Sequence, residues 1–173
     1  MIIRRENPSD YDEVYRLVKA SFATTPDDDG TTADYVNDIR KLDFFVPQLS
    51  LVAENEDGVL VGHIVLYKFP VITPQGEMTQ LLMSPISVHP GCFRRGIART
   101  MIDAASRIAV QMGYGAVFLY GNPQIYSKLG FVPTYCYGIF HKEDAAAEWS
   151  MVRELYDGAL DGIKGTIDHV EVL

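Results

Sequence analysis

The stretch that most constrains the fold covers residues 83–98, which run from an apolar strand through a tight loop into a helix. Residues 81–88 are apolar apart from two serines, and Pro90 and Gly91 then force a turn. Beyond the turn, apolar side chains recur at helical spacing, which predicts an amphipathic helix over residues 94–112. Its expected buried face comprises Ile97, Met101, Ile102, Ala105, Ile108, Ala109 and Met112.

A helix that opens at this loop predicts an anion-binding site. The first N–H groups of a helix have no partner inside the helix, and the helix dipole favours negative charge at that end. Arg94 and Arg95 add positive charge, while Gly96 allows a ligand to approach the backbone closely. A phosphate group suits such a site.

The other periodicities predict a mixed α/β fold. A helix is expected to start at residues 7–10 and to extend to Phe22, with further helices over residues 32–42 and 124–129. Expected strands cover residues 1–6, 49–55, 59–69, 77–88, 116–120, 134–141, 149–155 and 165–172. Residues 56–58 predict a hairpin turn, residues 70–76 a second turn, and Gly130 a left-handed helix cap. Alternating strands and helices in the second half predict parallel strand pairing there.

The 173 residues show no repeat and no break in composition, which predicts a single domain over residues 1–173. No apolar run approaches the ~18 residues of a membrane span, and the first residues lack the apolar region of a signal peptide. We therefore expect a cytoplasmic protein without a membrane partner. The formal charge of −8 disfavours nucleic acid as a partner, because binding it requires a basic surface. Cys92 and Cys136 match no metal-ligand spacing, so no metal is expected and both are predicted to be free thiols.

Two motifs of the chain resemble the GCN5-related N-acetyltransferase (GNAT) superfamily. Its signature, Gln/Arg-x-x-Gly-x-Gly/Ala, follows a strand that ends in Val-x-Pro, and residues 88–90 read Val-His-Pro. Residues 93–98 read Phe-Arg-Arg-Gly-Ile-Ala, so Phe93 stands where Gln or Arg is usual. Residues 126–131, Tyr-Ser-Lys-Leu-Gly-Phe, resemble the family's Tyr-x-x-x-Gly-Phe box. With residues 84–88, 121–123 and 151–166, they resemble the YhbS-like branch of bacterial acetyltransferases.

The resemblance implies an acyl-CoA N-acyltransferase fold. Such a fold has a central mixed sheet of about seven strands, splayed at the fourth strand, with helices on both faces. Pro85 agrees independently, since it cannot donate to a ladder and so predicts a bulge in the strand of residues 77–88. The co-substrate implied is acetyl-CoA. The residues implied to bind it are Ile86, Ser87 and Val88 for the pantetheine, and Arg94, Arg95, Gly96, Ile97, Ala98 and Arg99 for the pyrophosphate, with Asn122 as a further contact.

The same resemblance makes Tyr126 the catalytic candidate. Attack of a neutral amine on the thioester produces an intermediate that must expel a thiolate, and a general acid beside the sulfur lowers that barrier. A phenol with an ordinary pKa of about 10 can donate usefully to a thiolate whose thiol has a pKa of about 8.5. Tyr126 could instead only pack at the start of its short helix.

A general base is not evident. Many family members carry a glutamate on the fourth strand, but no acid lies between Met78 and Val88 here. His63, Glu77 and His89 are the candidates, and the neutral fraction of the amine could also react without a base.

The expected function is transfer of an acetyl group from acetyl-CoA to a primary amine, by direct attack in a ternary complex. One alternative is a non-catalytic domain that binds or senses acyl-CoA, and another is a nucleotide-binding regulatory module. The acceptor stays open among peptide N-termini, lysine, polyamines, aminoglycosides and small amines. A homodimer is possible in this family, and the sequence does not decide it.

Overall fold

The computed structural model describes residues 1–26 and 28–170. These residues form two compact units. The first comprises residues 1–67 and 84–108, and the second residues 68–83 and 109–170. Strands β3 (Leu60–Thr73) and β4 (Gly76–Val88) each contribute to both units. The single domain expected over residues 1–173 stays a prediction.

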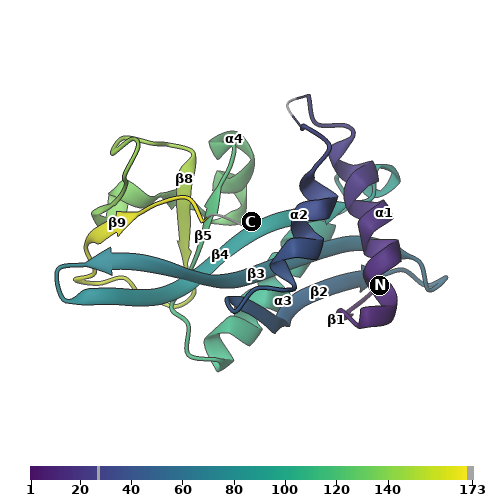
Figure 1. The fold of residues 1–173 in the computed structure, drawn as a ribbon, viewed down its shortest axis with the longest axis horizontal. Coiled ribbons are helices and arrows are strands. Elements are labelled where there is room, and N and C mark those ends of the chain that lie inside the picture. The colour runs from purple at the N-terminus through teal and green to yellow at the C-terminus, as the bar shows by residue number, and fades with distance from the viewer. Residues whose placement is uncertain (27, 171–173) are drawn as a thin grey trace. The chain divides into compact units, whose positions relative to one another are not determined.

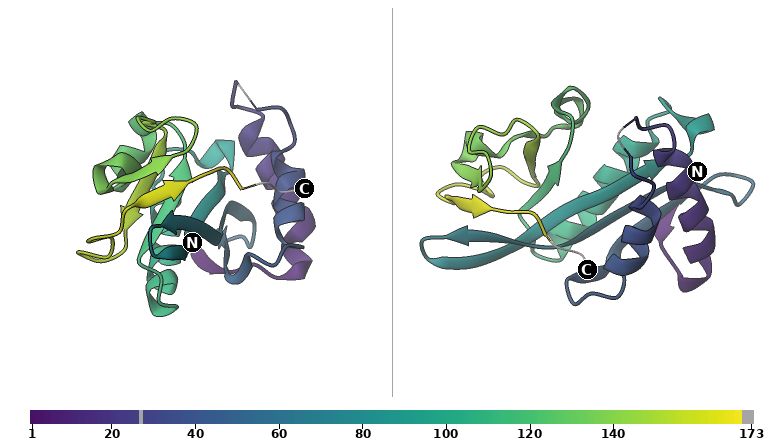
Figure 2. Two further views of the ribbon diagram at one scale, coloured as in Figure 1. Left: turned by 60° about the vertical axis from the view of Figure 1, so that its left-hand side comes forward. Right: turned by 45° about the horizontal axis from the view of Figure 1, so that its top comes forward.

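In the first unit, three antiparallel strands carry helices on both faces. Strand β1 (Ile2–Arg5) pairs with β2 (Phe45–Glu54), and β2 pairs with β3. Helices α1 (Tyr11–Phe22) and α2 (Thr32–Ile39) lie on one face and α3 (Ile97–Gln111) on the other (Figures 1 and 2). A Cβ atom at Gly62 would lie 2.7 Å from Cε of Met101, so α3 packs closely against this part of β3.

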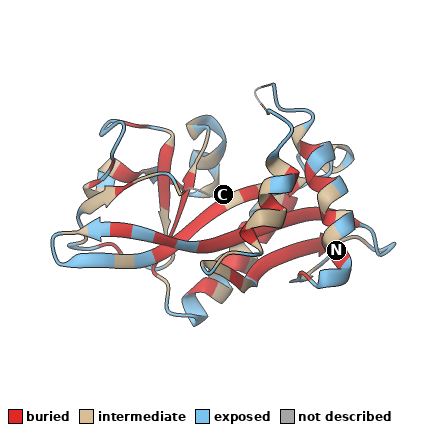
Figure 3. Cartoon of the chain, viewed as in Figure 1, coloured by how far each residue is buried: buried red, intermediate tan, exposed pale blue. Residues whose placement is uncertain are grey.

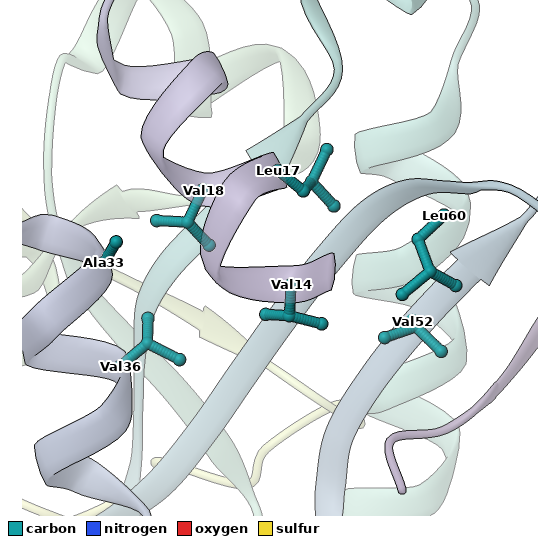
Figure 4. Close-up of a cluster of buried hydrophobic side chains, with 7 residues drawn as sticks. All are labelled: Val14, Leu17, Val18, Ala33, Val36, Val52 and Leu60. Carbon is teal, nitrogen blue, oxygen red and sulfur yellow. The ribbon is translucent and has the colours of Figure 1, made fainter. Parts of the chain in front are cut away.

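Apolar side chains hold α1 and α2 against the strands. Seven buried residues form one cluster on this face (Figure 4). Strands β2 and β3 are buried over most of their length, whereas the outer helix faces are exposed (Figure 3). The cluster consists of Val14, Leu17, Val18, Ala33, Val36, Val52 and Leu60. Each larger side chain contributes about 1.5–3 kcal/mol of stability when it leaves water.

In the second unit, parallel and antiparallel strands are mixed. Leu81 and Leu82 of β4 pair in parallel with β5 (Ala116–Tyr120). Antiparallel to β5 lies β8 (Ser150–Glu154), which also pairs with β6 (Val132–Pro133). Strand β7 (Ile139–His141) pairs in parallel with β9 (Gly165–Ile167). Helix α4 (Pro123–Tyr126) follows β5, and short 3-10 helices cover Ser127–Leu129 and Thr134–Tyr137. In the first unit, 3-10 helices cover Pro8–Asp10 and Pro90–Cys92.

The mixed α/β fold expected from the sequence is confirmed, with differences in detail. The described residues form nine strands rather than about seven, and among them the two-residue strand β6 lies outside every expected strand. Residues 134–137 form a 3-10 helix instead of the expected strand. The second turn covers only residues 74 and 75, since β3 continues through Pro70 to Thr73. The last expected strand ends at Ile167, and residues 171 and 172 of that prediction lie outside the described part.

The helix expected over residues 94–112 is three residues shorter at its start. Arg94 and Gly96 have positive φ angles, which no right-handed helix contains, so α3 begins at Ile97. Most of the expected inner face is buried, but Met112 is 41% exposed because the helix ends at Gln111. The opening of the sheet predicted near Pro85 falls where β4 passes from one unit to the other, and it stays a prediction.

Candidate coenzyme and catalytic sites

The end of β4 presents the backbone groups expected to meet a pantetheine chain. Ile86 and Val88 are half-buried, and the Ser87 side chain is buried. The N–H of His89 donates to the carbonyl oxygen of Val61 on β3, at 2.9 Å. The N–H of Val88 points away from β3 and donates to Oγ of Ser21, at 3.3 Å.

Oγ of Ser21 therefore accepts a hydrogen bond from the Val88 N–H, a donor that the family resemblance assigns to the coenzyme. It lies in the last turn of α1, 67 residues before Val88. No local pattern connects the two positions, so only the packing of α1 against the strands brings them together.

The loop before α3 has the backbone shape of an anion-binding turn. Arg94 has φ 62° and Gly96 has φ 77°, both in the left-handed region. Successive N–H groups near such residues converge on a small concavity, and the free N–H groups at the start of α3 follow it directly. The side chains of Arg94 and Arg95 are exposed, as are Gly96 and Arg99. Residues 94–99 thus form the loop before α3 and its first turn, where the sequence predicts an anion-binding cradle.

Beside this loop lies a hollow of about 420 Å³ within the first unit. It is lined by Met1, Asn55, Glu56, Asp57, Val61, Cys92, Arg95 and Ile97. Cys92 is a free thiol here and Cys136 is free as well, as expected from their spacing.

Replacement of Gly96 by alanine is expected to weaken acetyl-CoA binding about five- to thirtyfold. A Cβ atom at this position would contact no other group, so space is available, but a φ of 77° costs a residue with a side chain about 1–2 kcal/mol. Isothermal titration with acetyl-CoA measures the effect. Gly76→Ala is the control, because Gly76 also has a positive φ and open space but lies in the turn between β3 and β4. Equal affinity in wild type and Gly96→Ala would show that this loop does not bind the coenzyme.

Tyr126 and Asn122 lie in the second unit, where helix α4 positions them. Oδ1 of Asn122 accepts from the N–H of Gln124 at 2.9 Å and so caps the helix. The N–H of Tyr126 donates to the Asn122 carbonyl oxygen. The sequence assigned Asn122 to the coenzyme, and its side-chain oxygen is here engaged in capping.

The ring of Tyr126 is fixed on two sides. It meets Phe131 edge to face, with 6.0 Å between ring centroids. A Cβ atom at Gly121 would lie 2.5 Å from Cε2 of Tyr126, so only glycine leaves room for the ring. The Tyr126 phenol is protonated at neutral pH, and burial raises its pKa, so it gives up its proton less readily than an exposed phenol does. A protonated hydroxyl on an oriented ring is what a general acid requires.

The three candidate bases differ in their surroundings. Glu77 is exposed at the start of β4. His89 is exposed, and its Nδ1 accepts from the N–H of Gly91. His63 is fully buried, and its Nε2 lies 3.4 Å from Oε1 of Glu6 and 3.3 Å from Oγ of Ser50. His63 is thus the candidate whose ring is held by other side chains.

Among the described residues, His141, Glu143 and His169 could hold a metal ion. Their donor atoms lie within 4.8 Å of one another, and Nε2 of His169 lies 3.2 Å from Oε2 of Glu143. Nδ1 of His141 accepts from the N–H of Glu143, so the neutral ring carries its proton on Nε2. A metal ion would have to displace this hydrogen bond, because a ring nitrogen ligates only through a free lone pair.

Within residues 1–26 and 28–170, no helix has both the length and the apolar character that crossing a membrane requires.

Three comparisons with known proteins agree with one another. The sequence model of the GNAT acetyltransferase domain matches residues 2–134. The uncharacterized N-acetyltransferase YhbS of Escherichia coli K12 is 28% identical over 99% of this chain and 97% of its own length. The crystal structure of E. coli YhbS in complex with CoA has a TM-score of 0.83 and 27% identity, and the match covers 98% of this chain and 89% of that one.

A second solved structure shows the same fold. The GNAT family acetyltransferase of Brucella melitensis, in complex with acetyl-CoA, has a TM-score of 0.76 and 22% identity over 99% of this chain and 96% of that one. Since the family model covers more than half of the residues, and both sequence motifs occur in their strand-to-helix context, this chain belongs to the GNAT acetyltransferase family.

Proposed function

We propose that this protein transfers the acetyl group of acetyl-CoA to a primary amine, by direct attack of the amine in a ternary complex. The observation that carries the proposal is the cradle of residues 94–99 at the start of α3, in a chain of the GNAT family. The complex of the related YhbS with CoA supports acetyl-CoA as the co-substrate.

In this proposal the cradle binds the pyrophosphate through backbone N–H groups and through Arg94 and Arg95. The end of β4, residues 86–88, pairs with the pantetheine. Because the N–H groups supply most of the contacts, Phe93 does not remove the site, although it is 44% exposed where the family usually has a polar side chain.

Tyr126 is proposed as the general acid. The amine nitrogen forms a bond to the thioester carbon, the C–S bond breaks, and the phenol gives its proton to the departing sulfur. The ring packing described above would keep the hydroxyl in one orientation during this step. The extra proton on the new amide nitrogen then returns to the phenolate.

An assay of thiol release from acetyl-CoA across a panel of amines tests the proposal. The panel contains peptide N-termini, lysine peptides, polyamines, aminoglycosides and small alkylamines. Amine-dependent release with one class is the expected result and would also identify the acceptor. Binding of acetyl-CoA without release in any class would favour an acyl-CoA-binding domain, and tighter binding of ADP than of CoA would favour a nucleotide-binding module.

A further inference from the structure

Two buried polar atoms of the first unit have no hydrogen-bond partner among the described residues. They are Nδ1 of His63 and Oγ of Ser87. His63 is 0% exposed and Ser87 is 1% exposed. Leaving such a group unpaired destabilises the folded state, so buried polar atoms normally have a partner or a function.

The strand geometry places these two side chains on the same face. The N–H of His89 donates to Val61 on β3, and the next N–H, of Val88, points the opposite way, as in a regular strand. The His89–Val61 bond places residue 89 opposite residue 61. Two residues further along each antiparallel strand, Ser87 lies opposite His63. Gly62 faces α3, so the neighbouring His63 faces the side of α1 and α2.

The contacts of His63 engage one ring nitrogen and leave Nδ1 without a partner among the described residues. Its Nε2 lies 3.4 Å from Oε1 of Glu6, so the ring proton belongs on Nε2. Arg40 neutralises Glu6, with its Nε 3.2 Å from Oε2, and Oγ of Ser50 donates to the same oxygen at 2.7 Å. The ring of Tyr11 covers the Arg40 guanidinium at 4.0 Å, and the hydroxyls of Tyr35 and Tyr67 pair with each other.

These contacts also explain how His63 could hold a second proton. Burial by itself raises the pKa of Glu6, but His63 and Arg40 outweigh it through hydrogen bonds and charge, and lower the pKa to about 2. Glu6 therefore stays ionised across the working pH range. A carboxylate behind the ring stabilises an imidazolium, while Nδ1 on the other side offers its lone pair.

We propose that Ser87 and His63 form the route by which the proton of the acceptor ammonium leaves, with Glu6 and Ser50 as positioning residues. The proposal rests on the acetyl transfer proposed above. The ammonium gives one proton to Oγ of Ser87, whose own proton passes through one water to Nδ1 of His63. The neutral amine then attacks the thioester, and the imidazolium later releases its proton to solvent. One proton leaves for each amide formed, so the route balances the reaction.

The test compares two acceptors in the wild type and in His63→Gln and Ser87→Ala. One acceptor is the fastest alkylamine of the panel, and the other is a fluorinated analogue that is already neutral at the assay pH. With the alkylamine, both variants are expected to lose about 10²-fold in kcat/KM, and the loss should shrink as the pH rises. With the neutral analogue, both variants should lie within a few-fold of the wild type. Ser150→Ala is the control, because it removes a buried strand hydroxyl in the second unit.

Equal losses with both acceptors and at every pH would overturn the proton route. Melting temperature and acetyl-CoA affinity are measured for every variant, and Ser87→Ala keeps the test valid should His63→Gln fail to fold. If the wild type binds acetyl-CoA but acetylates no amine, the proposed function itself fails, which is a different result from an unchanged pH profile.

Discussion

Replacement of Tyr126 by phenylalanine is expected to lower kcat by about 10²–10⁴-fold, the usual contribution of a general acid. The substitution removes one hydroxyl and keeps the ring that packs against Phe131. Melting temperature and acetyl-CoA affinity should therefore stay close to those of the wild type. Steady-state kinetics at saturating acetyl-CoA, combined with titration calorimetry, measure both quantities. An unchanged kcat would remove Tyr126 from the mechanism.

Gly121→Ala separates the position of the phenol from its chemistry. The added Cβ atom must displace the Tyr126 ring, since it would lie 2.5 Å from Cε2. The hydroxyl remains in the protein, but in a different position. If orientation matters, kcat should fall in this variant as well, whereas a freely moving acid would leave kcat unchanged.

Arg40→Met is expected to destabilise the protein by about 3–5 kcal/mol at neutral pH. Arg40 and Glu6 form an ion pair whose side chains are 6% and 2% exposed, and removing one partner leaves a buried charge uncompensated. Urea unfolding measures the loss. Lys41→Met is the matched control, because the neighbouring Lys41–Asp38 pair is largely exposed and should cost less than about 1 kcal/mol.

The contacts of Glu6 with His63 and Arg40 also predict how stability depends on pH. The folded-state pKa of Glu6 is about 2, below its ordinary value of 4.5, so its contribution is complete above pH 4.5. That contribution should be lost progressively as the pH falls from 4.5 toward 2. In Arg40→Met the Glu6 pKa rises, so unfolding measured between pH 5 and pH 3 should depend less on pH. An equally steep dependence in the variant would show that other carboxyl groups dominate acid unfolding.

Local sequence patterns predicted the elements around the cradle well. The change from strand to helical periodicity across residues 88–97, together with Pro90 and Gly91, located the loop. Gly130 marked the end of the helix predicted over residues 124–129, which the structure has at residues 123–129. Each of these signals acts within a few residues, so it can be read without knowledge of the packing.

Long-range contacts could not be read in this way. Ser21 meets Val88, and His63 meets Glu6 and Ser50, only because helices and strands distant in sequence pack together. The aromatic run at residues 134–141 was predicted as a strand because aromatic residues favour strands. A 3-10 turn at Thr134–Tyr137 forms instead, and its Thr134 pairs with Ser150 of β8.

The Ser21–Val88 hydrogen bond has a thermodynamic consequence for coenzyme capture. If a pantetheine carbonyl pairs with the Val88 N–H, it replaces a hydroxyl that α1 already supplies, so the step exchanges one bond for another. A newly formed hydrogen bond contributes about 0.5–1.5 kcal/mol of binding free energy, and such an exchange contributes less than that. Affinity for the coenzyme would then come mainly from its charged end, and the carbonyl pairing would serve to align the thioester. Rising salt should therefore weaken the binding of the coenzyme more than it weakens the binding of a neutral pantetheine fragment.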